Sequence, residues 1–410
     1  MTEQAKVPEI RFAGFTDPWE QRKLGDVASS FDYGLNAAAT EYDGQNKYLR
    51  ITDIDDETHE FSKSDLTTPL ADLAMSADYL LKEGDLLFAR TGASVGKTYL
   101  YRQFDGMVYF AGFLIRARIG EGADPEFAYQ ATLTDAYKKY VAITSQRSGQ
   151  PGVNAQEYAD YQLMLPSKTE QQQIGMTLRS LDDLITLHQR KYDKLVVFKK
   201  SMLEKMFPKD GESVPEIRFA GFTDPWEQRE LVDIAEIVGG GTPDTNNSNY
   251  WDGDIDWYAP AELGNNIYAE SSTRKITQAG FDSCSTKMLP ADKTILFTSR
   301  AGIGNTAILR HSACTNQGFQ SLVIGDADVY FVYSMSERIK KWAEEKASGS
   351  TFLEISGRQL ETMPVNLPSL VEQQAIGSFF SHLDDLITLH QRKLELLQNI
   401  KKSLLDKMFA

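Results

Sequence analysis

The sequence has little of what covalent cross-linking, metal binding or catalysis requires. Its 410 residues include two cysteines, Cys284 and Cys314, and five histidines whose positions lack the spacing of a metal site. No serine–histidine–aspartate arrangement and no pair of catalytic carboxylates stands out along the chain. We therefore predict no disulfide framework, no metal ligands, no cofactor-binding residues and no catalytic residues.

Long apolar runs are missing as well. No stretch of eighteen apolar residues occurs, and the opening M-T-E-Q-A-K has no apolar signal core. The sequence therefore predicts a cytoplasmic protein that has no membrane partner. Its net charge of −15 argues against a simple nucleic-acid binder. Because the segments 167–207 and 369–410 are neutral or positive, the acidity lies elsewhere, and DNA contact there would need local basic patches or a partner.

Two long helices are the clearest structural prediction. The motif L-D-D-L-I-T-L-H-Q-R-K occurs at 181–191 and again at 383–393, and each copy follows a Ser-x-x-Glu helix start after a proline. Apolar residues then alternate in steps of four and three, which is typical of a coiled-coil seam. The predicted seam consists of Ile174, Leu178, Leu181, Ile185, His188, Leu195, Ile376, Phe380, Leu383, Ile387, His390 and Leu394.

Neither helix can bury such a stripe alone, so we expect the two to pack against each other as an antiparallel coiled coil. Lys199 and Lys401 interrupt the seam at equivalent places, and His188 and His390 are interpreted as polar residues that set its register. The alternative is two amphipathic helices, each packed on its own domain.

A second repeat shows that the chain is an internal duplication. V-P-E-I-R-F-A-G-F-T-D-P-W-E-Q-R recurs unchanged at the start of each half, and between the repeats lie dissimilar bodies of short strands and a few helices. We therefore predict an α+β protein in which the near-identical repeats form a common frame around two different recognition bodies. The predicted segments are a first body at 1–165, a first helix at 166–207, a linker and second body at 208–366, and a second helix at 367–410.

A glycine loop in each body resembles a phosphate-binding loop only superficially. G-A-S-V-G-K-T at 92–98 has three residues between its glycines where a nucleotide loop has four, and Asn305 stands in the second body where Lys97 would be. Asp17-Pro18-Trp19 lacks the second proline of a methyltransferase motif and indicates a turn with a packed tryptophan. A nucleotide-dependent enzyme is thus disfavoured.

Recognition chemistry is the remaining interpretation of these loops. Glycine lets a backbone approach phosphates closely, and arginine or asparagine can read base edges with two hydrogen bonds. The alternative is that they are ordinary solvated turns. The candidate DNA-binding residues are Arg90, Thr91, Ser94, Lys97, Arg147, Gln150, Asn154, Ser299, Arg300 and Asn305.

With both repeats in view, nearly the whole chain resembles the specificity (S) subunit of type I restriction-modification systems. The second body departs from the family's loop pattern because it lacks the lysine. The matching features are the P-x-(L/I)-R-F-x-G-F-x-x-x-W-E opening at 8–20 and 215–227, the G-x-S-x-G-K loop within 87–97, the G-G-T-P…W-x-G-x-I-x-W stretch at 240–257, and the L-P-x-x-x-E-Q-x-x-I helix starts.

The resemblance implies two target-recognition domains that each read one half of a split sequence in double-stranded DNA. It further implies that the two helices form the spacer and dock methyltransferase (M) subunits, two in number, with restriction (R) subunits joining through the complex. The chain itself would be no enzyme and hold no cofactor, since S-adenosylmethionine, ATP and Mg²⁺ belong to the partners. A rival from another class is a two-domain coiled-coil scaffold that binds protein and has no DNA specificity.

Overall fold

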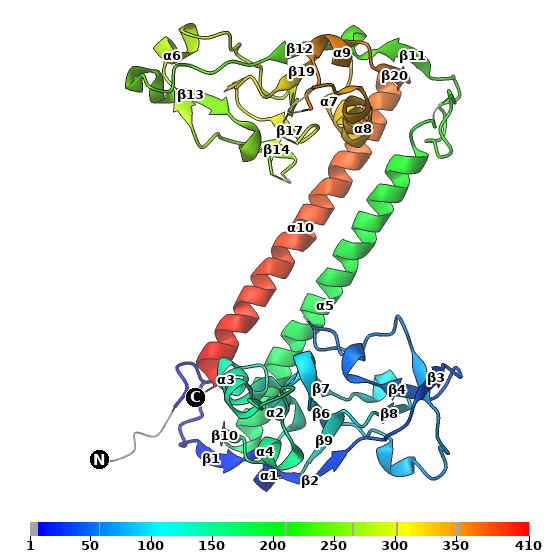
Figure 1. Ribbon diagram of the computed structural model, residues 1–410, viewed down its shortest axis with the longest axis vertical. Helices are drawn as coiled ribbons and strands as arrows, with labels where there is room; N and C mark the ends of the chain where they lie inside the picture. The colour runs from blue at the N-terminus through cyan, green and yellow to red at the C-terminus, as the bar shows by residue number, and fades with distance from the viewer. Residues whose placement is uncertain are drawn as a thin grey trace. The chain divides into compact units, whose positions relative to one another are not determined.

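The computed structural model describes two compact units, each built around one body. Unit 1 comprises Met1–Arg190 with Gln391–Ala410, and unit 2 comprises Lys191–His390 (Figure 1). Each unit therefore takes part of both long helices, and the domain boundaries expected from the sequence stay predictions. The residues that the structure describes are 7–56, 58–209, 211–264, 266–300, 302–349 and 353–409.

The body of unit 1 is organised by an antiparallel four-stranded sheet in the order β2-β9-β6-β7. Strand β6 is buried at all five positions because its alternate side chains enter two different cores: Leu86 and Phe88 one, Leu87 and Ala89 the other. The elements are β1 (Glu20–Lys23), α1 (Leu24–Val27), β2 (Ala28–Tyr33), β3 (Ala39–Glu41), β4 (Lys47–Leu49), β5 (Thr67–Pro69), β6 (Asp85–Ala89), β7 (Thr98–Leu100), β8 (Val108–Phe110), β9 (Leu114–Ile119), α2 (Pro125–Ala131), α3 (Asp135–Thr144), α4 (Ala155–Ala159) and β10 (Gln162–Leu165).

The body of unit 2 repeats this design with a five-stranded sheet in the order β12-β19-β16-β17-β14 and a three-stranded sheet β15-β13-β18. In β16, Ile295 and Phe297 enter one core while Leu296 enters another. The elements are β11 (Glu227–Glu230), β12 (Ala235–Gly239), β13 (Trp251–Tyr258), β14 (Tyr268–Ala269), β15 (Lys275–Ile276), α6 (Gln278–Asp282), β16 (Thr294–Phe297), β17 (Thr306–Leu309), β18 (Cys314–Thr315), β19 (Gln320–Ile324), α7 (Val329–Ser334), α8 (Ser336–Lys346), α9 (Gly357–Glu361) and β20 (Pro364–Leu367). Two bodies of mixed α and β structure are thus confirmed.

Both long helices are present, as α5 (Lys168–Lys205) and α10 (Leu370–Met408). At each start a serine accepts a hydrogen bond from the glutamate amide three residues on, Ser167 from Glu170 and Ser369 from Glu372, both at 3.4 Å. Within the described residues, no helix combines the length and apolarity needed to cross a membrane.

Within each unit the segments of α5 and α10 run antiparallel. In unit 1, Ile174 and Leu178 near the start of α5 share a core with Met408 at the end of α10, and residues of the body fill the same core. In unit 2, Ile376 and Phe380 of α10 share a core with the end of α5 and with that body. The remaining predicted seam residues are half-buried, except Leu383, which is buried. Each seam segment thus packs on the other helix and on a body, and a continuous coiled coil stays a prediction.

The repeated segment that opens each half fastens these helices together. Arg11 donates through Nε and Nη2 to the carboxylate of Glu170 at 2.8 and 2.7 Å, while the amide of Ile10 donates to the carbonyl of Lys407 at 2.9 Å. The segment therefore joins the start of α5 to the end of α10. In unit 2, Arg218 makes the same two bonds with Glu372 at 2.7 Å, and the end of α5 receives the equivalent amide.

The Arg11–Glu170 pair generates a stability prediction. Arg11→Ala leaves a buried carboxylate without its partner, so the free energy of unfolding should fall by about 3–5 kcal/mol. Arg22→Ala is the matched control, because its pair with Glu20 is exposed and should be worth at most about 1 kcal/mol. Urea unfolding followed by circular dichroism measures both, and equal losses would contradict the assignment.

Candidate nucleic-acid interface

In unit 1 the fold brings the glycine loop and the polar loop at 145–154 into contact. The amide of Val153 donates to the carbonyl of Arg90 at 2.9 Å, and Thr91 forms a β-bridge with Gly152. Two loops whose contacting residues lie more than fifty residues apart in the sequence therefore form one surface.

Unit 2 makes the equivalent backbone contact at residues that carry different side chains. The amide of Ile355 donates to the carbonyl of Ser299 at 3.0 Å, and Arg300 forms a β-bridge with Glu354. Ser299 thus occupies the place of Arg90, and Arg300 the place of Thr91. The arginine of the second body has moved by one residue along an extended segment, which turns its side chain to the opposite side.

Among the predicted residues of unit 1, Arg147, Gln150 and Asn154 are exposed and Arg90 is half-buried. Arg90 lies over the ring of Tyr33, with the guanidinium carbon 5.0 Å from the ring centroid. Tyr33 is 45% exposed and was missed by sequence reasoning, although an aromatic residue at the end of a strand before Gly34 offered a signal. A half-buried cation stacked on an exposed aromatic ring suits contact with a base or a phosphate.

Asn154 and Arg147 also hold the local fold. The side chain of Asn154 accepts from the amide of Glu157 at 2.9 Å and so caps α4, while Arg147 pairs with the Glu157 carboxylate at 2.5 Å. Ser356 caps α9 in the same way in unit 2. The position of Asn154 is therefore explained by helix capping without any DNA contact.

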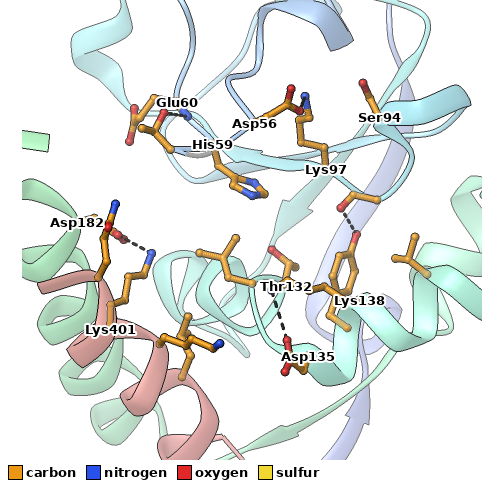
Figure 2. Close-up of a pocket in the computed structure, with 18 of the residues that line it drawn as sticks. Asp56, His59, Glu60, Ser94, Lys97, Thr132, Asp135, Lys138, Asp182 and Lys401 are labelled. Carbon is orange, nitrogen blue, oxygen red and sulfur yellow. Dashed lines mark hydrogen bonds and ion pairs between the residues drawn. The ribbon is translucent and has the colours of Figure 1, made fainter. Parts of the chain in front are cut away.

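Lys97 and Ser94 line a cavity of about 810 Å³ within unit 1, which lies between the body and segments of both long helices (Figure 2). Lys97 pairs with Asp56 and donates to the carbonyl of Ile54 at 2.9 Å, and its side chain is 11% exposed. The lysine is thus engaged by its own unit, unlike Asn305, which is exposed at the equivalent place in unit 2. Ser299 is buried.

His59 points into this cavity beside Thr132 (Figure 2) and has a left-handed backbone, with φ of 56°. Its Nδ1 lies 3.0 Å from the carbonyl oxygen of Thr98. Burial lowers the pKa of His59, and the nearby ammonium groups of Lys401 and Lys97 act in the same direction. Burial also raises the pKa of Glu60 in the same wall. At His59 and Glu60 the surroundings therefore favour the neutral side chain, whereas Lys97 and Lys401 in the same lining are held in ion pairs.

Metal chemistry has no support in the described ranges, where no three histidine, cysteine or acidic side chains gather as a metal site would require. Cys314 is buried, and burial raises the pKa of its thiol to about 12, so it is a poor thiolate ligand.

The paired loops, the duplicated bodies and the two helices agree with the comparison to known families. The family described as "Type I restriction modification DNA specificity domain" matches residues 16–196 and again 223–399. The chain belongs to this family. The resemblance inferred from the sequence is confirmed, and with it the expectation of a non-catalytic specificity subunit, because the enzymatic activities of these systems lie in other subunits.

Individual proteins similar to this chain agree with the family match, over alignments of different length. The type I restriction enzyme MjaIX specificity subunit of Methanocaldococcus jannaschii is 36% identical over 190 residues, which cover 45% of this chain and 44% of that protein. The putative type I restriction enzyme MjaX specificity subunit of the same organism is 25% identical over 418 residues. That alignment covers 99% of this chain and 94% of the MjaX protein. The crystal structure of a type I S subunit from M. genitalium has the same fold, with a TM-score of 0.67, 16% identity and 99% coverage of both chains.

The half-buried histidine of the cavity, His59, generates a pH prediction. Because its folded pKa is lowered, the stability it contributes is fully present above its unfolded pKa of about 6.5 and is lost as the pH falls below that value. We expect His59→Asn, which keeps a residue that tolerates positive φ, to lessen the fall in melting temperature between pH 7 and pH 5. His311→Asn, at an exposed position, should retain the fall of the parent protein. An undiminished fall in His59→Asn would contradict the prediction.

Proposed function

We propose that the chain recognises a bipartite target in double-stranded DNA, with one half-site read by each body. The observation that carries the proposal is the equivalence of the paired loops: the backbone contacts are the same in both units, while the side chains they present differ. Matching backbone scaffolds that present different side chains suit two domains that recognise different DNA sequences.

We further propose that α5 and α10 form a continuous antiparallel coiled coil that acts as the spacer between the readers. A helix of 38 residues is about 57 Å long at 1.5 Å per residue. That length equals on the order of 17 base pairs of B-DNA, so it accommodates two half-sites separated by several base pairs.

The proposal assigns the remaining work to partners. Two M subunits would dock on the frame, R subunits would join through the complex, and S-adenosylmethionine, ATP and Mg²⁺ would bind in those subunits. The net charge of −15 supports this division, since partner subunits must then supply much of the phosphate contact. Such a complex would work in the cytoplasm, where it meets the DNA.

The test is selection from a randomised duplex pool by the full chain, alone and with its cognate M subunit, at a fixed salt concentration. The expected result is a two-part motif with a defined gap. Salt-sensitive binding without a motif would mean that the bodies hold only phosphates. No binding under either condition would favour the protein-binding scaffold.

Two arginines allow the half-sites to be tested separately. Arg90→Ala should weaken DNA binding by about 1–3 kcal/mol and relax the sequence preference in one half-site. Arg300→Ala should do the same in the other half-site only, so each variant is the control for the other. Selection from the randomised pool with the M subunit measures both. A uniform loss across both half-sites would contradict base reading by these residues.

Lengthening both helices together tests the spacer. Seven residues inserted after Arg190 in α5 and seven after Arg392 in α10 keep the heptad seam and add roughly 10 Å. The preferred gap should lengthen, by at most about 3 base pairs, while both half-site sequences stay the same. The same selection measures this, and altered half-sites at an unchanged gap would contradict the proposal.

A further inference from the structure

Two ion pairs join the long helices, one within each unit. In unit 1, the ammonium of Lys401 on α10 lies 2.5 Å from Oδ1 of Asp182 on α5, at the edge of the cavity (Figure 2). In unit 2, the ammonium of Lys199 on α5 lies 2.5 Å from Oδ1 of Asp384 on α10. All four side chains are at least partly withdrawn from water. These are the lysines that interrupt the apolar seam, and each meets the first aspartate of the L-D-D-L-I-T-L repeat.

Each aspartate also accepts a hydrogen bond, through its second carboxylate oxygen, from a residue in the body of its unit. The fully buried Gln130 of α2 donates through Nε2 to Oδ2 of Asp182 at 2.8 Å. The hydroxyl of Tyr330 in α7 donates to Oδ2 of Asp384, also at 2.8 Å. Burial and the neighbouring Asp384 raise the pKa of Tyr330, which keeps its hydroxyl a donor. One carboxylate therefore connects α5, α10 and a body in each unit, although the residue from the body differs.

The order of the charges along the helices has a consequence for their pairing. Each helix carries its aspartate first and its lysine 17 residues later. An antiparallel pair of such helices brings aspartate to lysine twice, as observed within the two units. A parallel pair would bring Asp182 to Asp384 and both lysines together, and like charges at close range oppose association.

The same charges resist sliding. A shift of one heptad in either direction would place Asp182 opposite Leu394 or Met408 of α10, so its partly buried carboxylate would lose its ion-pair partner at a cost in free energy. A purely apolar seam would tolerate that shift far better, because every heptad presents similar residues. Polar residues within coiled-coil seams are known to specify register in this way.

We infer that the Asp182–Lys401 and Asp384–Lys199 pairs are the positioning residues that select the antiparallel register of α5 and α10, and through Gln130 and Tyr330 they align each body with that register. The inference rests on the proposed spacer function. It predicts that the gap between half-sites depends on the positions of these charged residues along α5 and α10 as well as on the length of the helices.

The test reverses the charges one helix at a time. The first variant carries Asp182→Lys and Lys199→Asp in α5, the second carries Asp384→Lys and Lys401→Asp in α10, and the third carries all four substitutions. None changes the net charge. Either single-helix variant brings like charges together in both units, whereas the third restores opposite charges. The amide oxygen of Gln130 and the hydroxyl of Tyr330 can each accept a hydrogen bond from a lysine, so the link to the body survives the reversal.

A matched control lies one residue further along α5. Asp183 and Lys200 are exposed and have the same spacing of 17 residues, so Asp183→Lys with Lys200→Asp makes the same chemical change on the same helix. This variant should behave as the parent protein in every measurement.

The first measurement reports register without DNA. Nitroxide labels on cysteines substituted for the exposed Ser180 and Ser403 measure the α5–α10 distance in unit 1 by pulsed electron paramagnetic resonance. Cys284→Ser removes the more accessible native thiol, and Cys314 is buried. The parent, the control and the four-substitution variant should show one narrow distance. Each single-helix reversal should broaden or shift it, and a slide of one heptad moves a label by about 10 Å.

The second measurement is the gap selected from the randomised duplex pool with the M subunit. Single-helix reversal should reduce enrichment of the native gap at least about tenfold, and the four-substitution variant should restore it, with half-site sequences unchanged throughout. Unchanged label distances in the single-helix variants, or an unchanged gap, would overturn the inference. If those variants fail to fold, rescue by the four-substitution variant supports it, and loss of that variant while the control folds overturns it. Label distances that follow the charges, with no bipartite motif from any variant, would support the register and refute the proposed function.

Discussion

A helix of 38 or 39 residues with an apolar stripe needs a partner along its length, and this need organises the chain. Each half supplies one such helix, and within each unit the segments of the two helices cover one another together with the body. The bidentate arginine–glutamate pairs secure the starts of the helices. The ends are secured by backbone hydrogen bonds from the repeated opening segments. The stripe supplies the driving force for association, while the charged residues within it supply direction, which apolar contacts alone lack.

The remaining parts of each unit obey a different constraint. A central strand whose alternate side chains enter two cores holds the body together, and the loops at its end are joined by backbone hydrogen bonds. The frame therefore depends on particular side chains, such as Arg11 and Glu170, whereas the paired loops depend mainly on the path of the chain. This difference explains why the ends of the two halves are nearly identical while their middles have diverged.

The sequence predicted the helices, their starts and the mixed composition of the bodies, because periodicity and capping are local properties. It also aligned Asn305 with Lys97, and the carbonyls of these two residues accept equivalent backbone hydrogen bonds, from the amides of Thr298 and Ala89 respectively. The meeting of Arg90 with the loop at 145–154, the cavity that engages Lys97 and the link from Gln130 to Asp182 depend on residues far apart in the chain. Tyr33 was missed for the same reason. Whether the ten candidate residues contact DNA stays a prediction.

The hydrogen bond between the Arg90 carbonyl and the Val153 amide, and its counterpart at Ser299, involve no side-chain atoms. Replacement of the Arg90 side chain, which is only half-buried, therefore leaves the joint between the loops intact, whereas Ser299 is buried. In unit 1 the residue best placed to touch a ligand is thus one whose replacement leaves the backbone contacts of the loops in place. Mutation can explore new recognition chemistry at this position while the unit that presents it keeps its stability. Such a surface is open to evolutionary change because backbone hydrogen bonds, and not side chains, join its loops.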